Sequence, residues 1–347
     1  MNEFKQVFKY SLGGGKMNQP NKNPKYILIG KWLFNEIHLN DKPLFDQFIK
    51  ESEYPATVWS SNFAYLWASS QSGNRKTVWK IIEGMLVPFF YNVRHQYLSL
   101  VCLPFGKGDA EHVVNVLYKC MVYCYELNKL TGNQRYSRVR TINEAQLQFL
   151  QSSKKFNQHF DPKKLLGIER HYSIQKLINL AGKEFAYVRR KINKFHRKYP
   201  QAIIRKYNAD TDYHKVMEFN NNWAKEQDES IFDGTYFKEI LKYPDELDHT
   251  VLVVEIDGQI VGMTSGGGLP TGQSWTCLRK ADHKVEGLSE LLLCELVKES
   301  YKVNSSIEYM NDGSDLGDQG LIFFKERFRP ELNLNRYRVY LKNFNYR

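Results

Sequence analysis

The stretch HTVLVVEIDGQIVGMTSGG, residues 249–267, constrains the fold of this chain more than any other. Both of its arms are apolar runs rich in Val and Ile, which is typical of strands. Asp257 and Gly258 stand between the arms, and Asp-Gly is the preferred pair for a two-residue hairpin turn. The sequence therefore predicts an antiparallel hairpin around which the C-terminal half has to be arranged.

Predicted strands and helices follow the same order in both halves of the chain. The first half gives strands at 76–82, 85–91 and 97–105, a helix at about 109–128, a strand at 138–142 and a helix at 144–151. The second half gives the hairpin, a strand at 273–281, a helix at about 287–302, a strand at 305–311, a helix at 318–328 and a strand at 335–344. Between the halves lie a long helical stretch at about 173–199, a strand at 203–208 and helices at 211–227 and 234–242. The β-β-β-α-β-α order is that of the GNAT (GCN5-related N-acetyltransferase) fold and predicts an α+β protein with mixed sheets.

Length and composition agree with a globular protein of two domains. The chain has 347 residues, of which 42% are apolar and 14% aromatic. We expect a flexible segment at residues 1–25, an N-terminal domain at 26–170 and a C-terminal domain at 171–347. No apolar run approaches the roughly 18–20 residues that span a bilayer, and the N-terminus lacks the apolar core of a signal peptide. We therefore expect a cytoplasmic protein, with peripheral contact to the inner face of the membrane as an alternative.

Cysteine and histidine spacing argues against a metal site and against a disulfide framework. The five cysteines are scattered without CxxC spacing, and the nine histidines show no HExxH or paired-ligand spacing. Cys120 and Cys124 lie four residues apart in an apolar helix, where we expect them to pack in the core as small hydrophobes. The sequence predicts no metal ion.

The segment LINLAGKEFAYVRRKINKFHRKYP, residues 177–200, combines an apolar stripe with a dense basic surface. Its apolar residues recur every three or four positions, as in a helix with one buried face. Residues 189–198 include six Lys or Arg and no acid, whereas a structural helix normally interleaves Glu. Because an anion would offset this self-repulsion, we predict phosphate binding by this helix, with an unliganded, solvated basic surface as the alternative. The predicted contacts are Lys183, Arg189, Lys191, Lys194 and Arg197.

A second candidate anion site is RKADHKVEGLSE, residues 279–290, between a predicted strand and a helix start. Such a junction presents backbone N–H groups to an anion. In acetyltransferases the pyrophosphate of coenzyme A lies in a loop of pattern Gln/Arg-x-x-Gly-x-Gly/Ala. The nearest frame here, Lys284-x-x-Gly287-x-Ser289, alters two of the three fixed positions, and Glu286 would repel a pyrophosphate. Lys284 and Gly287 are candidate phosphate contacts, with an ordinary strand-to-helix turn as the alternative.

The stretch NDGSDLGDQGLIFFKERFRP, residues 311–330, sets three aspartates among glycines directly before a short apolar helix. Asp318 is placed to cap that helix. Asp312 and Asp315 then exceed what capping needs. They would repel a phosphate but suit a protonated amine, and their charge therefore predicts an amine-binding turn.

The last two motifs and the basic helix together resemble one bacterial family, the DUF2156 proteins related to the C-terminal catalytic domain of phosphatidylglycerol lysyltransferases. In the middle of the chain the shared positions are Leu180, Gly182, Lys183, Arg189, Arg190, Ile192 and Phe195. In the later motif, the more specific one, they are Asn311, Asp315, Leu316, Gly317, Gly320, Leu321, Lys325 and Pro330. KADHKVEGLSELLLCELV also looks like a segment of this family, and the resemblance extends over residues ~30–345.

The resemblance implies two tandem GNAT-like domains, each a mixed twisted sheet flanked by helices, with the active groove between them. It also implies an aminoacyltransferase that needs no bound cofactor, since lysyltransferases use aminoacyl-tRNA as donor and a phospholipid hydroxyl as acceptor. The basic helix would then bind the acceptor end of the tRNA through its phosphates. Preorganised charge would stabilise the tetrahedral oxyanion. The predicted catalytic residues are Asp315, Lys325 and Arg190, and the predicted substrate contacts are Asn311, Asp312, Gly317, Gly320 and Arg327.

Two other functions stay open at this point. The fold and the loop at 284–289 fit acyl transfer from a coenzyme A thioester. The basic surface fits a non-catalytic binder of RNA or of an anionic phospholipid membrane. The sequence contains no convincing general base for any transfer reaction.

Overall fold

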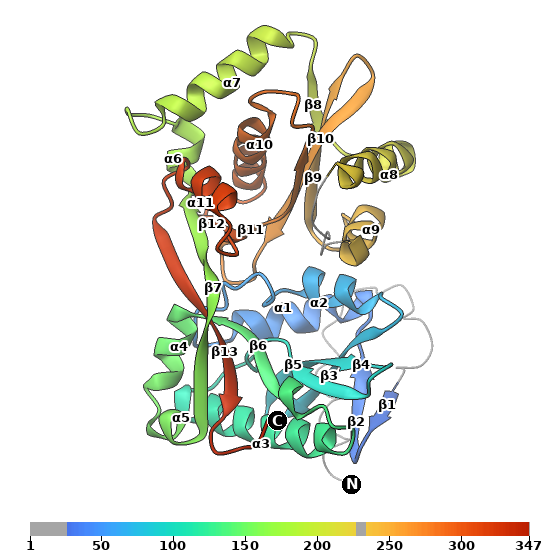
Figure 1. The fold of residues 1–347 in the computed structure, drawn as a ribbon, viewed down its shortest axis with the longest axis vertical. Coiled ribbons are helices and arrows are strands. Elements are labelled where there is room, and N and C mark those ends of the chain that lie inside the picture. The colour runs from blue at the N-terminus through green and yellow to red at the C-terminus, as the bar shows by residue number, and fades with distance from the viewer. Residues whose placement is uncertain (1–25, 227–233, 347) are drawn as a thin grey trace, which may run out of the picture.

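The computed structural model describes residues 26–226 and 234–346, which form two lobes joined by one continuous sheet (Figure 1). The predicted flexible segment at 1–25 lies outside the described residues. The lower lobe contains β1 (Tyr26–Ile29), β2 (Trp32–Glu36), η3 (Leu39–Asp41), α1 (Lys42–Lys50), α2 (Phe63–Ser70), β3 (Arg75–Ile82), β4 (Met85–Asn92), β5 (Tyr97–Leu100), α3 (Ala110–Lys129), η4 (Gln134–Tyr136), β6 (Arg138–Asn143), α4 (Glu144–Gln151) and α5 (Lys154–His159).

The rest of the chain forms the upper lobe and returns at its end to the lower one. Its elements are β7 (Phe160–Ser173), α6 (Ile174–Asn179), α7 (Ala186–Lys198), β8 (Ile203–Lys206), α8 (Ala209–Lys225), α9 (Gly234–Lys242), β9 (His249–Ile256), β10 (Gln259–Gly268), β11 (Ser274–Ala281), α10 (Leu288–Val303), β12 (Tyr309–Ser314), α11 (Gln319–Glu326) and β13 (Leu332–Leu341). The strand order is β1-β2-β3-β4-β5-β6-β13-β7-β12-β11-β10-β9-β8. Mixed strand directions and flanking helices confirm the predicted α+β class, built as two tandem GNAT-like units.

The predicted hairpin forms as β9 and β10, with Asp257 and Gly258 at positive φ of 50° and 79°. The central strands and helices of both halves also form where the apolar periodicity placed them. The pattern missed β1, β2, α1, α2, α5 and β7. It also ended β12 too early, because this strand continues through the Asn-Asp-Gly-Ser sequence that was expected to be a turn.

The predicted long helix at 173–199 is wrong, because the chain breaks it into α6 and α7. Leu180 ends α6 in the left-handed conformation at φ 47°, and Gly182 follows at φ 86°. A left-handed residue is a common helix C-terminus because it reverses the chain and satisfies the last carbonyls. α7 is therefore a separate helix that begins at Ala186.

Strands β7 and β13 connect the two lobes. They pair with each other from Phe160↔Leu341 to His171↔Leu332, and β13 also pairs with β6. At its upper end β7 pairs with β12. The predicted domain boundary between residues 170 and 171 thus falls inside an unbroken strand, and the end of the chain completes the lower lobe.

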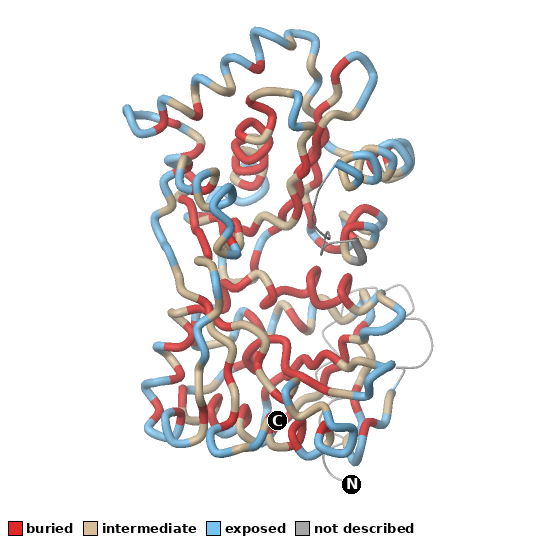
Figure 2. The backbone as a smooth tube through the Cα atoms, in the orientation of Figure 1, coloured by how far each residue is buried: buried red, intermediate tan, exposed pale blue. Residues whose placement is uncertain are grey.

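The helices of the two lobes differ in how far they are buried (Figure 2). Helix α10 is buried along most of its length between the upper sheet and α7, whereas α7 buries only Val188 and Phe195. In the lower lobe α3 carries Cys120 and Cys124 into the core, which confirms their predicted packing role. No helix among the described residues has the length and apolar character required to cross a bilayer.

Candidate functional site

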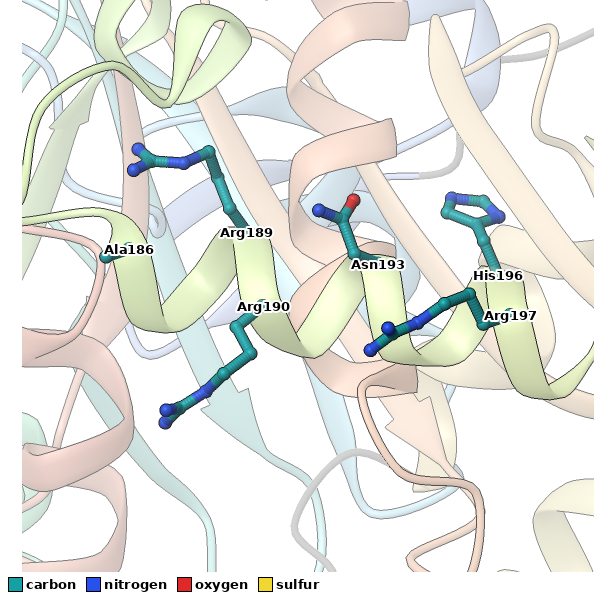
Figure 3. A pocket seen from close by; sticks show the side chains of 6 residues that line it. All are labelled: Ala186, Arg189, Arg190, Asn193, His196 and Arg197. Atoms are coloured by element: carbon teal, nitrogen blue, oxygen red, sulfur yellow. The ribbon is translucent and has the colours of Figure 1, made fainter.

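Six residues of α7 line an open hollow of about 560 Å³ (Figure 3). They are Ala186, Arg189, Arg190, Asn193, His196 and Arg197. Figure 3 shows Arg190 and Arg197 extending from one side of the helix, and Arg189, Asn193 and His196 from the other. Arg190 and Arg197 are seven positions apart, so they lie two helical turns apart on one side. We call this the α7 surface.

Internal partners already hold three of the predicted phosphate contacts. Arg189 donates to the backbone carbonyls of Leu180 and Gly182, which satisfies the end of α6. Lys191 and Lys194 each lie 2.6 Å from a carboxylate oxygen of Glu286. Hydrogen bonds from these two lysines lower the pKa of Glu286 to about 2. Residues 189–198 contain no acid themselves, and the loop before α10 supplies the acidic partner of these two lysines.

Three of the predicted site residues are cations without a carboxylate partner in the described structure. Within residues 26–226 and 234–346, Lys183, Arg190 and Arg197 form no ion pair with a carboxylate. The guanidinium of Arg190 lies 5.5 Å from the ring centre of Tyr187 and stays exposed. Arg190 and Arg197 on α7, together with Lys183 in the turn before it, can therefore neutralise phosphates of a ligand.

Lys284 and Gly287 lie at the start of α10 and have contacts of their own. The ammonium of Lys284 is 3.0 Å from Glu226. Gly287 has a φ of 84°, and a Cβ atom there would overlap the carbonyl oxygen of Lys191. Gly287 is thus the point where α10 and α7 meet, and phosphate binding by this pair stays a prediction.

A buried ionic centre surrounds Asp312 on β12. Arg279 of β11 donates to both carboxylate oxygens at 3.0 and 3.3 Å, and the ammonium of Lys325 on α11 lies 3.2 Å away. The hydroxyl of Tyr172 on β7 adds a contact at 3.3 Å. Burial alone would raise the pKa of Asp312, but the charges of Arg279 and Lys325 outweigh it and hold this pKa at about 2. Burial lowers the pKa of Lys325.

Asp315 forms a second buried pair beside the first. Its carboxylate accepts from Nε and Nη2 of Arg170 at 3.0 and 2.8 Å, and from the backbone N–H of Ile168 and Gly317 at 2.9 and 3.1 Å. Burial alone would raise the pKa of Asp315, and these donors together lower it. Both aspartates therefore already hold a cation of the chain, and amine binding by them stays a prediction. Asp318 caps α11 as predicted, accepting from the backbone N–H of Leu321 at 2.7 Å.

The ionic centre lies where β11 and β12 separate. These parallel strands pair only at Ser274↔Met310 and Trp275↔Asn311, although β11 continues for six more residues to Ala281. The Arg279–Asp312 pair crosses the resulting gap. Strands that diverge leave backbone groups without ladder partners, which makes such a gap a natural place for a ligand backbone or acyl chain to bind.

Asn311 belongs to the junction of the lobes. Its amide donates to the backbone carbonyl of Thr57 in the lower lobe at 2.8 Å and to the carboxylate of Glu169. The same carboxylate oxygen lies 3.1 Å from Nε2 of His171, and all three side chains are fully buried. Glu169 Oε2 and His171 Nδ1 are left without a partner in the described structure. Asn311 thus fixes the two lobes together beside the ionic centre.

Arg327, which follows α11, contacts α7 through Tyr187. Its guanidinium lies 4.4 Å from the ring centre of Tyr187 on α7 and 4.3 Å from that of Phe323 on α11, and it is 3.3 Å from Glu290. Gly317 packs against Leu166 at φ 77°, and Gly320 lies in the exposed first turn of α11. Arg190 contacts the same Tyr187 ring, whereas Lys325 and Asp315 are buried.

Sequence reasoning missed the partners that neutralise the aspartates. Arg170 and Tyr172 lie on β7, which was not predicted, and Arg279 was quoted only as the start of a loop motif. Charge balance could have predicted these partners, because a buried carboxylate requires a nearby cation. Arg279 near the end of β11 is such a cation.

Comparisons with known proteins agree with this architecture. The profile of the family described as phosphatidylglycerol lysyltransferase, C-terminal, matches residues 139–340. A conserved protein of unknown function from Bacteroides thetaiotaomicron is similar in structure at a TM-score of 0.71 and 21% identity, over 89% of this chain and 99% of that one. L-PGS from Bacillus licheniformis gives 0.59 and 17%, over 88% and 93%. The C-terminal DUF2156 domain of a putative lysylphosphatidylglycerol synthetase from Agrobacterium fabrum gives 0.59 and 14%, over 88% and 92%. No curated protein matches the sequence.

Proposed function

This chain belongs to the family of phosphatidylglycerol lysyltransferase C-terminal domains, and on that premise we propose that it transfers an aminoacyl group from aminoacyl-tRNA to a hydroxyl or amine acceptor. The observations that carry the proposal are the α7 surface with its unpaired cations and the gap between β11 and β12 that the Arg279–Asp312 pair crosses. A polyanionic donor would bind the former while its acyl end reaches the latter.

The charge of the α7 surface supports tRNA as the donor. Lys183, Arg190 and Arg197 meet solvent without a carboxylate partner in the described residues, in a chain of net charge +11. Contacts of this kind are made to phosphates and depend strongly on salt. Fewer free cations are available to bind a coenzyme A pyrophosphate at the loop before α10. Lys284 is paired with Glu226, and Glu286 is paired with Lys191 and Lys194 of α7.

The transfer itself needs little from the protein beyond position and charge. The acceptor oxygen or nitrogen attacks the ester carbonyl carbon, the bond to the tRNA ribose oxygen breaks, and the acceptor proton passes to that oxygen. The negative charge of the tetrahedral intermediate is where a preorganised cation contributes most. Arg327 is partly exposed and contacts Tyr187 of α7, and in this proposal it meets the substrate. Lys325, Asp312 and Asp315 support the strands and α11 beneath it.

The decisive experiment measures binding of labelled aminoacyl-tRNA at ~0.15 M salt. The Arg190→Ala plus Arg197→Ala variant is expected to bind at least ~10-fold more weakly, with a log–log salt slope about 1–2 smaller, because two phosphate contacts are lost. Lys129→Ala plus Lys154→Ala, which removes the same charge from the exposed lower lobe, serves as control. Equal binding by both variants and the unmodified chain would contradict the proposal. Displacement of tRNA by acetyl-CoA would favour a coenzyme A enzyme.

A transfer assay then separates binding from catalysis. Label that leaves the tRNA and becomes bound to an added phosphatidylglycerol or amine acceptor would support the reaction. Arg327→Ala is expected to lower this rate by roughly 10²-fold with tRNA binding retained, because it removes charge stabilisation of the intermediate. tRNA that binds but is never deacylated beyond its spontaneous rate would leave an RNA-binding protein instead.

A further inference from the structure

Three arginines gather on one face of the lower sheet, around the ring of Phe90 on β4. The guanidinium groups of Arg75 from β3 and Arg140 from β6 lie 5.1 and 4.8 Å from the centre of that ring. Arg138 precedes Arg140 by two positions on β6, and residues two apart on a strand share a face. The guanidinium of Arg138 lies 5.3 Å from the ring centre of Tyr136. Arg75, Arg138 and Arg140 define what we call the arginine cluster.

The arginine cluster has no acidic partner in the part of the chain that the structure describes. Arg138 donates to a backbone carbonyl and to the hydroxyl of Tyr340, and its buried Nε is left without a partner there. The side chain of Arg140 forms no hydrogen bond to any described residue. Asp161 of β7 lies on the same face, but it is paired with Lys163 at 2.7 Å. The three charges of the cluster are therefore uncompensated among the described residues.

Burial makes the missing counter-charge costly at Arg140. Burial lowers the pKa of Arg140, and the positive charges of Arg75 and Arg138 lower it further. A cation that is withdrawn from water without a partner costs free energy. In the upper lobe the buried Arg279 avoids this cost by pairing with Asp312. Because the described fold supplies no such carboxylate to Arg140, this position points to an anion from outside the chain.

We propose that the arginine cluster binds a small molecule through a phosphate group. Arginine and phosphate form paired, charge-assisted hydrogen bonds. A phosphate monoester carries a charge of about −1.5 to −2 at pH 7, so it offsets more of the cluster's charge than a single carboxylate does.

The arrangement of the cluster favours a compact anion over a nucleic-acid backbone. Arg75 and Arg138 both lie close enough to Arg140 to act on its charge, so the three cations surround one point. Arg190 and Arg197, in contrast, follow one side of a helix, as contacts to successive phosphates require. The cluster lies in the lower lobe and the α7 surface in the upper one, so this proposal does not depend on the proposed transfer reaction.

The test is isothermal titration calorimetry of the full chain, without tRNA, with inorganic phosphate at pH 7 and a constant ionic strength of ~0.15 M. We expect saturable binding, weakened at least ~10-fold in Arg140→Met and several-fold in Arg75→Gln, because each change removes a charge-assisted donor. Met keeps an apolar chain near Phe90 and Arg75 is exposed, so both variants are expected to fold, which thermal unfolding checks. Arg197→Met removes an unpaired cation of the α7 surface instead and is expected to bind phosphate as the unmodified chain does. Acetate should bind at least ~10-fold more weakly than phosphate.

Several results would overturn this proposal. Absence of saturable phosphate binding is one, and equal loss of binding in Arg140→Met and Arg197→Met is another. Equal affinity for acetate would make the ligand a carboxylate. Weaker tRNA binding by Arg140→Met, with no phosphate binding by the unmodified chain, would make the cluster part of the nucleic-acid site. Because the calorimetry contains no tRNA, failure here leaves the proposed reaction untouched.

Discussion

Asp312 shows how a single residue can be forced into a network. A carboxylate buried without a cation would take up a proton or destabilise the fold, so this position demands positive charge around it. Arg279 and Lys325 supply that charge from two other elements. The acidic turn of a basic chain is thus neutralised from within.

We expect Asp312→Asn to destabilise the protein by about 3–5 kcal/mol. The amide leaves two buried cations without their counter-charge, which is the costly way to break a buried pair. Urea unfolding at pH 7 measures the effect. Asp318→Asn, in the same stretch but exposed and still able to cap α11, should change the free energy of unfolding by only a few tenths of a kcal/mol. Similar values for the two variants would contradict the network.

The same carboxyl predicts a pH dependence. Its pKa is about 2 in the folded chain against an ordinary value of 3.8, so its contribution is full above pH ~4 and is lost as pH falls toward 2. The shift corresponds to about 2 kcal/mol. The difference in unfolding free energy between the unmodified chain and Asp312→Asn should therefore narrow by about 1.5 kcal/mol between pH 5 and pH 2.5, where the folded carboxyl is still mostly ionised. A constant difference would show that Asp312 is protonated, or equally paired, in both states.

Gly287 allows a matched test of a close contact. Gly287→Ala meets both the cost of a positive φ and the carbonyl of Lys191, whereas Gly272→Ala meets only the φ cost, with open space around it. We expect Gly287→Ala to be the more destabilising by about 1–3 kcal/mol. Thermal or urea unfolding of the two variants gives the difference directly. Equal effects would mean that α7 and α10 can separate freely at this point.

At the scale of elements, α7 has some cations that are free and others that are held in ion pairs. Glu286 from the loop before α10 holds Lys191 and Lys194, so only part of the helix charge meets solvent. This pairing also ties the orientation of α7 to α10. The loop therefore sets how many phosphates the α7 surface can contact.

Releasing those lysines should strengthen nucleic-acid binding. For Glu286→Gln we expect several-fold tighter tRNA binding at ~0.15 M salt and a salt slope steeper by about 1–2, because two more cations reach phosphates. Glu126→Gln on α3 makes the same charge change at an exposed site of the lower lobe and serves as control. An identical gain in both variants would reduce the effect to net charge.

The whole molecule is organised by its two long central strands. β13, the last strand, pairs with β6 and β7. The lower lobe, whose last helix α5 ends at His159, is therefore completed by residues 332–341 from the far end of the chain. Asn311 adds a bond from β12 to Thr57 across the same junction. The chain therefore crosses between the lobes twice, upward through β7 and back through β13.

Ending the chain at Glu331 should disturb the lower lobe although every residue removed follows the upper one. Without β13, the edges of β6 and β7 lose their partner, and the β6 amides should exchange at rates near those of an unfolded chain. Amides of β10, which pairs only with β9 and β11, provide the internal control and should stay more protected. Retained protection in β6 would show that the lower lobe folds without β13. Hydrogen exchange resolved by strand makes this comparison.

Local sequence determined much of this protein, and the physical reason is that these features depend on neighbours in the chain. The 249–267 hairpin, the apolar helices α3 and α10 and the Asp318 cap follow from turn chemistry and periodicity within a few residues. The family motif likewise marked the stretch from Asn311 to Pro330 before any fold was known.

Only the tertiary structure decided which charges meet. Arg170 and Asp315 are 145 positions apart, and Lys191 and Glu286 are 95 apart, so no local pattern can pair them. β7 was missed because its Lys, Pro and Gly weaken strand propensity, and pairing with β12 and β13 on either side overrides that weakness. Long-range strand pairing thus settled which aspartates are neutralised inside the fold and which cations of α7 remain for a ligand.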